Sequence, residues 1–152
     1  MPHLAAEDLV TITASVSQLH DIGAVPGGTR HIDLIGAGKF EGSRLRGDLL
    51  PGGMDMKTLR ADGSMVPNVR LVLRTDDGAL IFMHYTGVRH GSPAVMARIA
   101  AGEVVAPSEY YLRNTPYFET SARKYDWLNR IVAVGVGRRM PDHAVYDVFE
   151  IL

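Results

Sequence analysis

The sequence predicts an all-β fold, a single antiparallel and closed β-barrel of about 8–10 strands with one or two short helices. Sixteen glycines and eight prolines are spread along the 152 residues, and they divide the chain into short segments with turn signals at intervals of about ten residues. The segments between these signals are rich in β-branched residues that alternate with polar ones. Such alternation is typical of strands with one buried face.

The strand pattern is clearest in residues 9–16, 30–35, 69–75, 79–86, 130–137 and 143–151. The third and fourth of these segments are joined by Asp76-Asp77-Gly78, where the glycine supplies the positive φ of a hairpin turn. Pro51-Gly52-Gly53 predicts a corner between two strands, and the glycine-rich residues 36–42 predict tight turns and bulges.

One longer helix is predicted between Ser92 and Gly102. Ser92 offers an N-cap, Pro93 suits the first helical turn and Gly102 suits the end of a helix. Val95, Met96 and Ile99 fall on one face of this helix. Residues 124–129 predict one further short helical turn.

A barrel is favoured over a sandwich because several strands alternate apolar residues with Arg, His or Tyr. Residues 69–74 and 82–85 show this pattern. It suits a closed sheet in which one face is dry and the other is partly polar and lines a cavity. The alternative is that these polar side chains face solvent, and alternation alone leaves both interpretations open.

Length and composition define the class of protein. A chain of this length predicts one domain, residues 1–152, and a net charge of −1 argues against a nucleic-acid partner. The absence of cysteine excludes disulfides and thiolate chemistry. The N-terminus does not resemble a secretory signal, and no apolar run approaches the roughly 20 residues that span a bilayer. We therefore expect a cytoplasmic protein without a membrane partner.

The histidines do not predict a metal site. His84 and His90 are the only two that lie near each other in a predicted strand and its end, and their spacing does not place them side by side on one strand face. No carboxylate accompanies them in the pattern that divalent metals require. We expect neither a metal ion nor a cofactor.

Aromatic residues gather in residues 110–120 and 125–129, which hold four of the six tyrosines and the only tryptophan. Tyr and Trp combine an apolar body with a polar tip, which suits a ligand pocket. Arg113 and Glu119 add a cation and an acid to this segment. The alternative is an aromatic cluster that closes one end of the barrel, with Arg113 and Glu119 forming an ion pair.

Several motifs occur in the order found in a known family. They are residues 27–30, 36–42, 51–55, 75–81, 111–119 and 125–129. In these motifs the sequence resembles the domain-of-unknown-function family 3237, also called uncharacterised protein family 0311, over about residues 7–151. The resemblance implies a lipocalin-like β-barrel. The family usually carries Ala-Asp-Trp after the two glycines, where this chain has Met54-Asp55-Met56 and so keeps only the acid.

From these residues we expect a cofactor-independent enzyme that acts by acid/base catalysis inside the barrel. Its substrate would be a small oxygenated molecule, cyclic or aromatic and carbonyl-bearing, and its reaction an isomerisation, cyclisation or elimination. Asp55 would be the general acid or base, with a pKa raised by Met54 and Met56, while Tyr85, Arg113 or Tyr117 would polarise the substrate. The expected substrate-binding residues are Arg30, Arg60, His84, Tyr117, Phe118, Glu119, Trp127 and Asn129.

The sequence is also compatible with other classes of function. A lipocalin-like protein that binds a small molecule without catalysis would use the same pocket wall, and it would need no acid with a raised pKa. A lactone or ester hydrolase would use the same groups together with a water. A purely structural role is the third alternative. An exposed aromatic segment on a half-covered barrel also predicts a homodimer.

Overall fold

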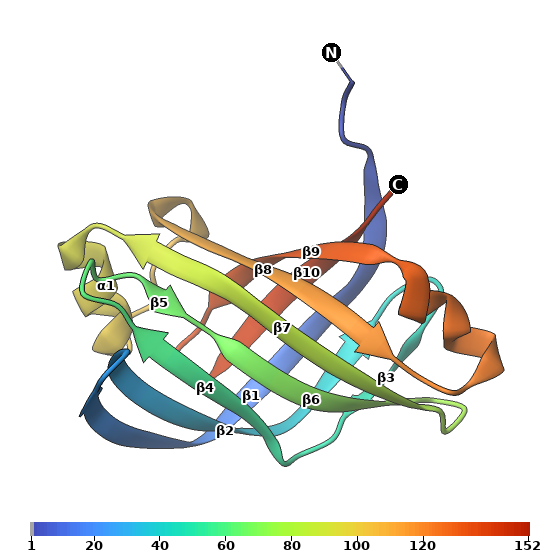
Figure 1. Cartoon of the computed structure of the whole chain (residues 1–152), viewed down its shortest axis with the longest axis horizontal. Helices are drawn as coiled ribbons and strands as arrows, with labels where there is room; N and C mark the ends of the chain where they lie inside the picture. The colour runs from blue at the N-terminus through green and yellow to red at the C-terminus, as the bar shows by residue number, and fades with distance from the viewer. Residues whose placement is uncertain (1) are drawn as a thin grey trace.

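The computed structural model describes residues 2–152 and shows ten antiparallel strands that close into one barrel (Figure 1). The strands are β1 (Ala6–Val25), β2 (Gly28–Glu41), β3 (Arg46–Leu49), β4 (Gly53–Leu59), β5 (Met65–Val66), β6 (Asn68–Thr75), β7 (Leu80–Gly91), β8 (Tyr110–Glu119), β9 (Val132–Arg139) and β10 (His143–Ile151). Within the same residues the helices are α1 (Pro93–Ala100) and the 3₁₀ helices η1 (Pro107–Glu109) and η2 (Arg123–Arg130).

The barrel closes because β1 pairs with both β10 and β2. From β10 the sheet continues through β9, β8 and β7, and from there β5 and β6 lead to β4 and back to β2. This arrangement confirms the predicted fold class. Closure also removes most of the unpaired strand edges that would otherwise be open to pairing with another chain.

Local sequence signals explain several of these elements. Ser92 accepts a hydrogen bond from the Val95 backbone N–H at 3.2 Å and caps α1, and Gly102 follows the helix with a φ of +81°. Gly78 has a φ of +89° in the turn between β6 and β7. Gly52, with a φ of +105°, forms the corner between β3 and β4. The predicted helix, hairpin turn and corner are therefore confirmed.

The glycine-rich segment differs in part from its prediction. Residues 36–41 continue strand β2 and do not form tight turns. The predicted bulge does occur within this segment: between the pairs Ala14–Gly38 and Val16–Ile35, Gly36 and Ala37 of β2 lie opposite the single residue Ser15 of β1. A Cβ atom at Gly38 would lie 2.0 Å from the Thr13 carbonyl oxygen, so only glycine permits the strands to approach so closely here.

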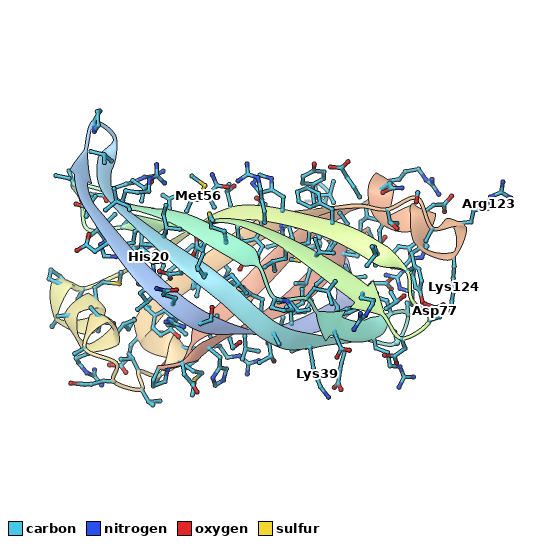
Figure 2. All side chains as sticks on the ribbon, turned by 90° about the horizontal axis from the view of Figure 1, so that it is seen from below. His20, Lys39, Met56, Asp77, Arg123 and Lys124 are labelled. Carbon is cyan, nitrogen blue, oxygen red and sulfur yellow. The ribbon has the colours of Figure 1, made fainter. Side chains whose placement is uncertain are left out.

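The two ends of the barrel differ in character. Helix η2 contributes Tyr125 and Leu128 to the apolar core, whereas α1 lies at the other end (Figure 1). Figure 2 shows the same division, with His20 near the α1 end and Asp77 and Lys124 together at the η2 end. The Tyr125 hydroxyl donates to Asp77 Oδ1 at 2.9 Å and ties η2 to the β6–β7 turn.

Inward and outward positions alternate along each strand, and strands differ in what they place inside. On β6 the apolar residues Val69, Leu71 and Leu73 are buried while Arg70 and Arg74 face solvent. On β2, β4, β7 and β9, charged residues point into the barrel towards the α1 end. Both interpretations of the alternation are thus correct, each for different strands. No helix in residues 2–152 has the length and apolar character needed to cross a membrane.

Candidate active site

A polar layer crosses the barrel interior and lines a small chamber of about 40 Å³. A single buried water needs roughly 10–15 Å³ on this scale, so the chamber holds only a few small groups. Its polar lining residues are Asp33, Asp55, Lys57, Tyr85, Arg89, Arg139 and Tyr146. Apolar side chains, among them Ile35, Met65 and Leu112, complete the wall.

Two acids of this layer are direct neighbours across strands β2 and β4, because Asp33 pairs with Asp55 in the register. They have different partners. Asp33 is only 3% exposed and forms an ion pair of 2.5 Å between Oδ2 and Lys57 Nζ. Asp55 Oδ1 accepts a hydrogen bond of 3.0 Å from the Asn68 backbone N–H, and no cation of residues 2–152 lies within 4.0 Å of its carboxylate.

Burial is the main cause of the shifted pKa of Asp55, which rises from 3.8 to about 6. The Asn68 N–H and the charge of Lys57 act in the opposite direction, while the negative charge of Asp33 adds to the increase. The expected cause of this raised pKa was wrong. Met54 and Met56 alternate with Asp55 and so lie on the outer face, where Met54 is 38% exposed, and the apolar surroundings come from the barrel interior.

Two buried phenols face the same chamber, Tyr85 at 4% and Tyr146 at 6% exposure. Their ring centroids lie 5.2 Å apart. Burial raises the pKa of Tyr146 to about 12 and that of Tyr85 well above its usual value, so both remain protonated donors. The register connects Asp55 to Val69 and Val69 to Tyr85, which separates the backbones of Asp55 and Tyr85 by two strand spacings, roughly 10 Å.

Glycines on β9 make room for this layer. At Gly137 an added Cβ atom would lie 2.6 Å from Tyr146 Cε1 and 2.5 Å from Leu112 Cγ. Both side chains are packed in the core, so neither can move aside easily to make room for a methyl group. The absence of a side chain at position 137 therefore allows the Tyr146 ring to lie where it borders the chamber.

We predict that Gly137→Ala lowers the free energy of unfolding by about 1–3 kcal/mol, the usual effect of overpacking a core. Gly27→Ala is the matched control, since nothing lies within 4 Å of a Cβ atom at that position. Urea unfolding of both variants measures the difference. An effect of the same size in both variants would contradict the proposed packing of Tyr146 against Gly137.

A larger vestibule of about 570 Å³ lies at the α1 end of the barrel. It shares Lys57, Met65, Arg89 and Arg139 with the chamber, so these four residues form the junction of the two spaces. Pockets that bind small molecules typically measure roughly 300–1,000 Å³. The vestibule has the volume of a ligand site, and the chamber beneath it admits only the tip of a ligand.

The structure brings together two of the three expected catalytic residues, Asp55 and Tyr85. It places Arg113 on the outer face of β8, where the guanidinium lies 4.8 Å from the centroid of the Tyr111 ring. The period of the strand is the physical reason, because the buried residues Leu112 and Asn114 on either side point inward. The positive charges of the chamber come instead from Arg89 and Arg139.

Arg30 and Arg60 also lie away from the chamber. Arg30 follows the outward alternation of β2 and donates from Nη1 to the Met56 carbonyl oxygen at 2.7 Å. Arg60 is exposed in the turn after β4. Neither residue lines the vestibule, whose basic residues are His20, His31, Lys57, Arg89 and Arg139.

His84, Tyr117 and Glu119 form a cluster on the outer surface of β7 and β8. The His84 and Tyr117 rings pack edge to face at 5.9 Å, His84 Nε2 lies 3.0 Å from Asn68 Oδ1, and the Tyr117 hydroxyl donates to Glu119 Oε1. The expected Arg113–Glu119 ion pair is not present among residues 2–152. Tyr117 is 46% exposed in the single chain, and the predicted homodimer stays a prediction.

The remaining expected residues lie at the η2 end. Phe118 is buried in the core, Trp127 packs beneath the Arg44 guanidinium at 4.2 Å, and Asn129 bonds the backbone of Thr120 through both side-chain atoms. The aromatic segment thus closes one end of the barrel, as the structural alternative stated, and the chamber lies elsewhere.

Sequence reasoning missed Asp33, Lys57, Arg89, Arg139 and Tyr146. Strand alternation offered a signal for Lys57, because it lies two residues from Asp55 and therefore on the same face of β4. Residues from β2, β7, β9 and β10 could be assigned to the same layer only from the register between strands. Within residues 2–152 no three His, Asp or Glu side chains gather in a way that could hold a metal ion.

Comparison with known proteins places this barrel in a family. A conserved protein of unknown function from Rhodopseudomonas palustris is 32% identical, with 99% of both chains covered, and its crystal structure superposes with a TM-score of 0.97 over the whole of both chains. A β-barrel-like protein from Acinetobacter baumannii is 36% identical with a TM-score of 0.87, covering 100% of this chain and 98% of that one.

A third relative comes from another bacterium. The protein from Clostridium acetobutylicum is 33% identical over 147 residues, which cover 95% of this chain and 92% of the relative. The family model described as "Protein of unknown function (DUF3237)" matches residues 5–151. This chain therefore belongs to the DUF3237 family, whose curated relatives carry the name UPF0311.

Proposed function

We propose that this protein is a cofactor-independent enzyme that performs acid/base chemistry on a small carbonyl-bearing molecule, as an isomerase, cyclase or lyase would. One observation carries the proposal. Asp55 is a carboxylate without a partner cation, and it shares a small interior chamber with two phenols that remain protonated. A base opposite hydrogen-bond donors is the arrangement that enolisation requires.

The proposed step moves one proton and shifts two electron pairs. The Asp55 carboxylate removes a proton from the carbon next to the substrate carbonyl, the electrons of that C–H bond form a C=C bond, and the π electrons of the C=O bond move to the carbonyl oxygen. Tyr85 and Tyr146 donate hydrogen bonds to the resulting oxyanion. Asp55, now protonated, returns the proton to a carbon or to a leaving group, so that atoms and charge balance without an added reagent.

The two neighbouring acids, Asp33 and Asp55, would have different roles in this mechanism. Asp33 is paired with Lys57 at 2.5 Å and remains bound in that ion pair. Asp55 lacks such a partner and has a pKa of about 6, which suits a group that must both accept and release a proton near neutral pH. Two neighbouring carboxylates with different surroundings, one paired with a cation and one unpaired, are a common basis for assigning acid and base roles.

The test follows α-proton exchange in D₂O by ¹H NMR, with cyclic 1,3-diones, β-keto esters and unsaturated γ-lactones as the substrate panel. We expect the wild-type protein to accelerate exchange in at least one class. Tyr85→Phe should slow that exchange by ~10²-fold, the usual effect of removing one oxyanion donor, and Tyr111→Phe on the outer face is the matched control.

Exchange at the uncatalysed rate in every class would contradict the proposed function. Binding of a panel member without any exchange would instead support the alternative, a small-molecule-binding protein. Equal rates for Tyr85→Phe and wild type would remove the phenol from the proposed step.

A further inference from the structure

We propose that Arg89 and Arg139 form a carboxylate-binding site at the junction of vestibule and chamber, and that the natural substrate is an organic carboxylate with an apolar, ring-sized body. The proposal rests on the proposed function only in taking the chamber as the reacting end of that substrate. Unpaired positive charge at the junction and an apolar wall above it support this site.

Both arginines line the interior chamber and neither has an acid partner. Arg44, Arg98 and Arg138 each form ion pairs with Asp or Glu. Across residues 2–152, neither Arg89 nor Arg139 has a carboxylate within 4.0 Å. Cations that are partly withdrawn from water are normally paired, so a negatively charged ligand would suit the space between these two arginines.

Arg89 is the less satisfied of the two. Its Nε atom is buried and has no hydrogen-bond partner. Arg139 donates from Nη1 to the His143 carbonyl oxygen at 3.0 Å, which fixes its guanidinium beside the chamber. Burial and the positive charge of Arg139 both lower the pKa of Arg89, and Tyr146, Tyr110 and the charge of Asp55 only partly offset them.

Other groups at the junction do not supply the missing negative charge. Asp33 is already paired with Lys57. Asp21 lies at the rim of the vestibule, 3.6 Å from His31 Nε2. A carboxylate between Arg89 and Arg139 would accept charge-assisted hydrogen bonds and relieve the repulsion between two like charges.

The wall of the vestibule indicates the rest of the ligand. Helix α1 contributes Met96, Ile99 and Ala100, and the barrel adds Leu19 and Leu59 from β1 and β4. Methionine adapts its shape to varied apolar surfaces, which suits a ring or short chain of carbon atoms. Volume and polarity therefore agree on an amphiphilic anion, with its body under α1 and its charged group at the arginines.

The test uses 2-naphthoate and 2-naphthamide, which share an apolar body and differ in charge. Isothermal titration at pH 8 should give a dissociation constant at least tenfold lower for the naphthoate with the wild-type protein. Arg89→Gln and Arg139→Gln should each remove most of that difference and leave naphthamide binding unchanged. Arg46→Gln, an exposed arginine 3.9 Å from Asp76, is the control and should keep the preference.

Equal affinity for the two compounds, or a preference that survives Arg89→Gln in a variant whose thermal midpoint matches the wild type, would overturn the carboxylate site. Asp55→Asn separates this inference from the proposed function, because it should retain or strengthen naphthoate binding. A protein that prefers naphthoate and exchanges no α-proton would keep the carboxylate site and lose the enzyme.

Discussion

Asp55→Asn is expected to slow α-proton exchange by ~10²–10⁴-fold. The same substitution is expected to make the protein more stable above pH 7. The loss of rate follows because Asn cannot accept the substrate proton. Asp48→Asn is the matched control, since Asp48 is an exposed acid on β3 that lies 3.8 Å from Arg74. Exchange that survives in Asp55→Asn would remove Asp55 from the proposed mechanism, whatever the effect on stability.

The gain in stability follows from the direction in which the pKa is shifted. Burial raises the pKa of Asp55 from 3.8 to about 6, so the native state binds this proton more tightly than the unfolded chain does. Stability therefore falls as the pH rises from about 4 through 6, and above this range the folded protein holds a carboxylate that burial disfavours. A difference of about two pH units corresponds to at most ~3 kcal/mol.

Asparagine removes this effect and keeps an oxygen that accepts the Asn68 N–H. We expect Asp55→Asn to exceed the wild type in free energy of unfolding by about 1–3 kcal/mol at pH 8, and to match it near pH 4. Urea unfolding at the two pH values measures the difference. A variant that is less stable than the wild type by the same amount at both pH values would contradict the argument.

Lys57→Met is expected to destabilise the protein by about 3–5 kcal/mol, the largest effect among these substitutions, because it leaves a buried carboxylate without its cation. Asp33 is nearly fully buried, and its Oδ1 atom already lacks a hydrogen-bond partner. The ion pair with Lys57 Nζ at 2.5 Å is what makes its charge tolerable inside the barrel.

Thermal and urea unfolding of three variants distinguish the stability lost with the Asp33–Lys57 ion pair from the stability lost with the packing of the Lys57 side chain. The double variant Asp33→Asn with Lys57→Met should recover at least half of the loss, since it removes both charges. Lys124→Met removes an exposed pair with Asp77 and should change stability by less than about 1 kcal/mol. If the single and double variants at positions 33 and 57 lose equal stability, packing by Lys57 and not its charge is responsible.

Much of the fold could be predicted because its signals are local. Residues 143–151 match β10, and residues 69–75 match β6 to within one residue. Strand β8 was missed because its aromatic residues drew a functional interpretation, although Tyr110, Leu112 and Phe118 alternate inward as in any strand. Strands β3 and β5 are too short to give a periodic signal.

The site was harder to predict because its members come from strands distant in the sequence. Asp55 and Tyr85 were found from their residue type and setting, yet the arginines that accompany them were chosen from the wrong face of the sheet. Arg113 and Arg89 are equally plausible from composition. The strand predicted from the sequence ended at residue 86, whereas β7 continues to Gly91, and along it Arg89 shares the face of the buried Met83 and Tyr85 and pairs with Leu112.

One end of β1 determines, under the proposed function, which part of the barrel would select the ligand. Beyond Ser15 this strand pairs with β2 alone, because its pairing with β10 stops there. Residues 16–25 and helix α1 frame the vestibule, yet neither carries the acids or phenols of the chamber. Insertions, deletions and substitutions in these two segments could therefore alter which molecular bodies are admitted while the reacting groups stay in place. Under the proposed function, the chamber would keep the same reacting groups while the segments around the vestibule change.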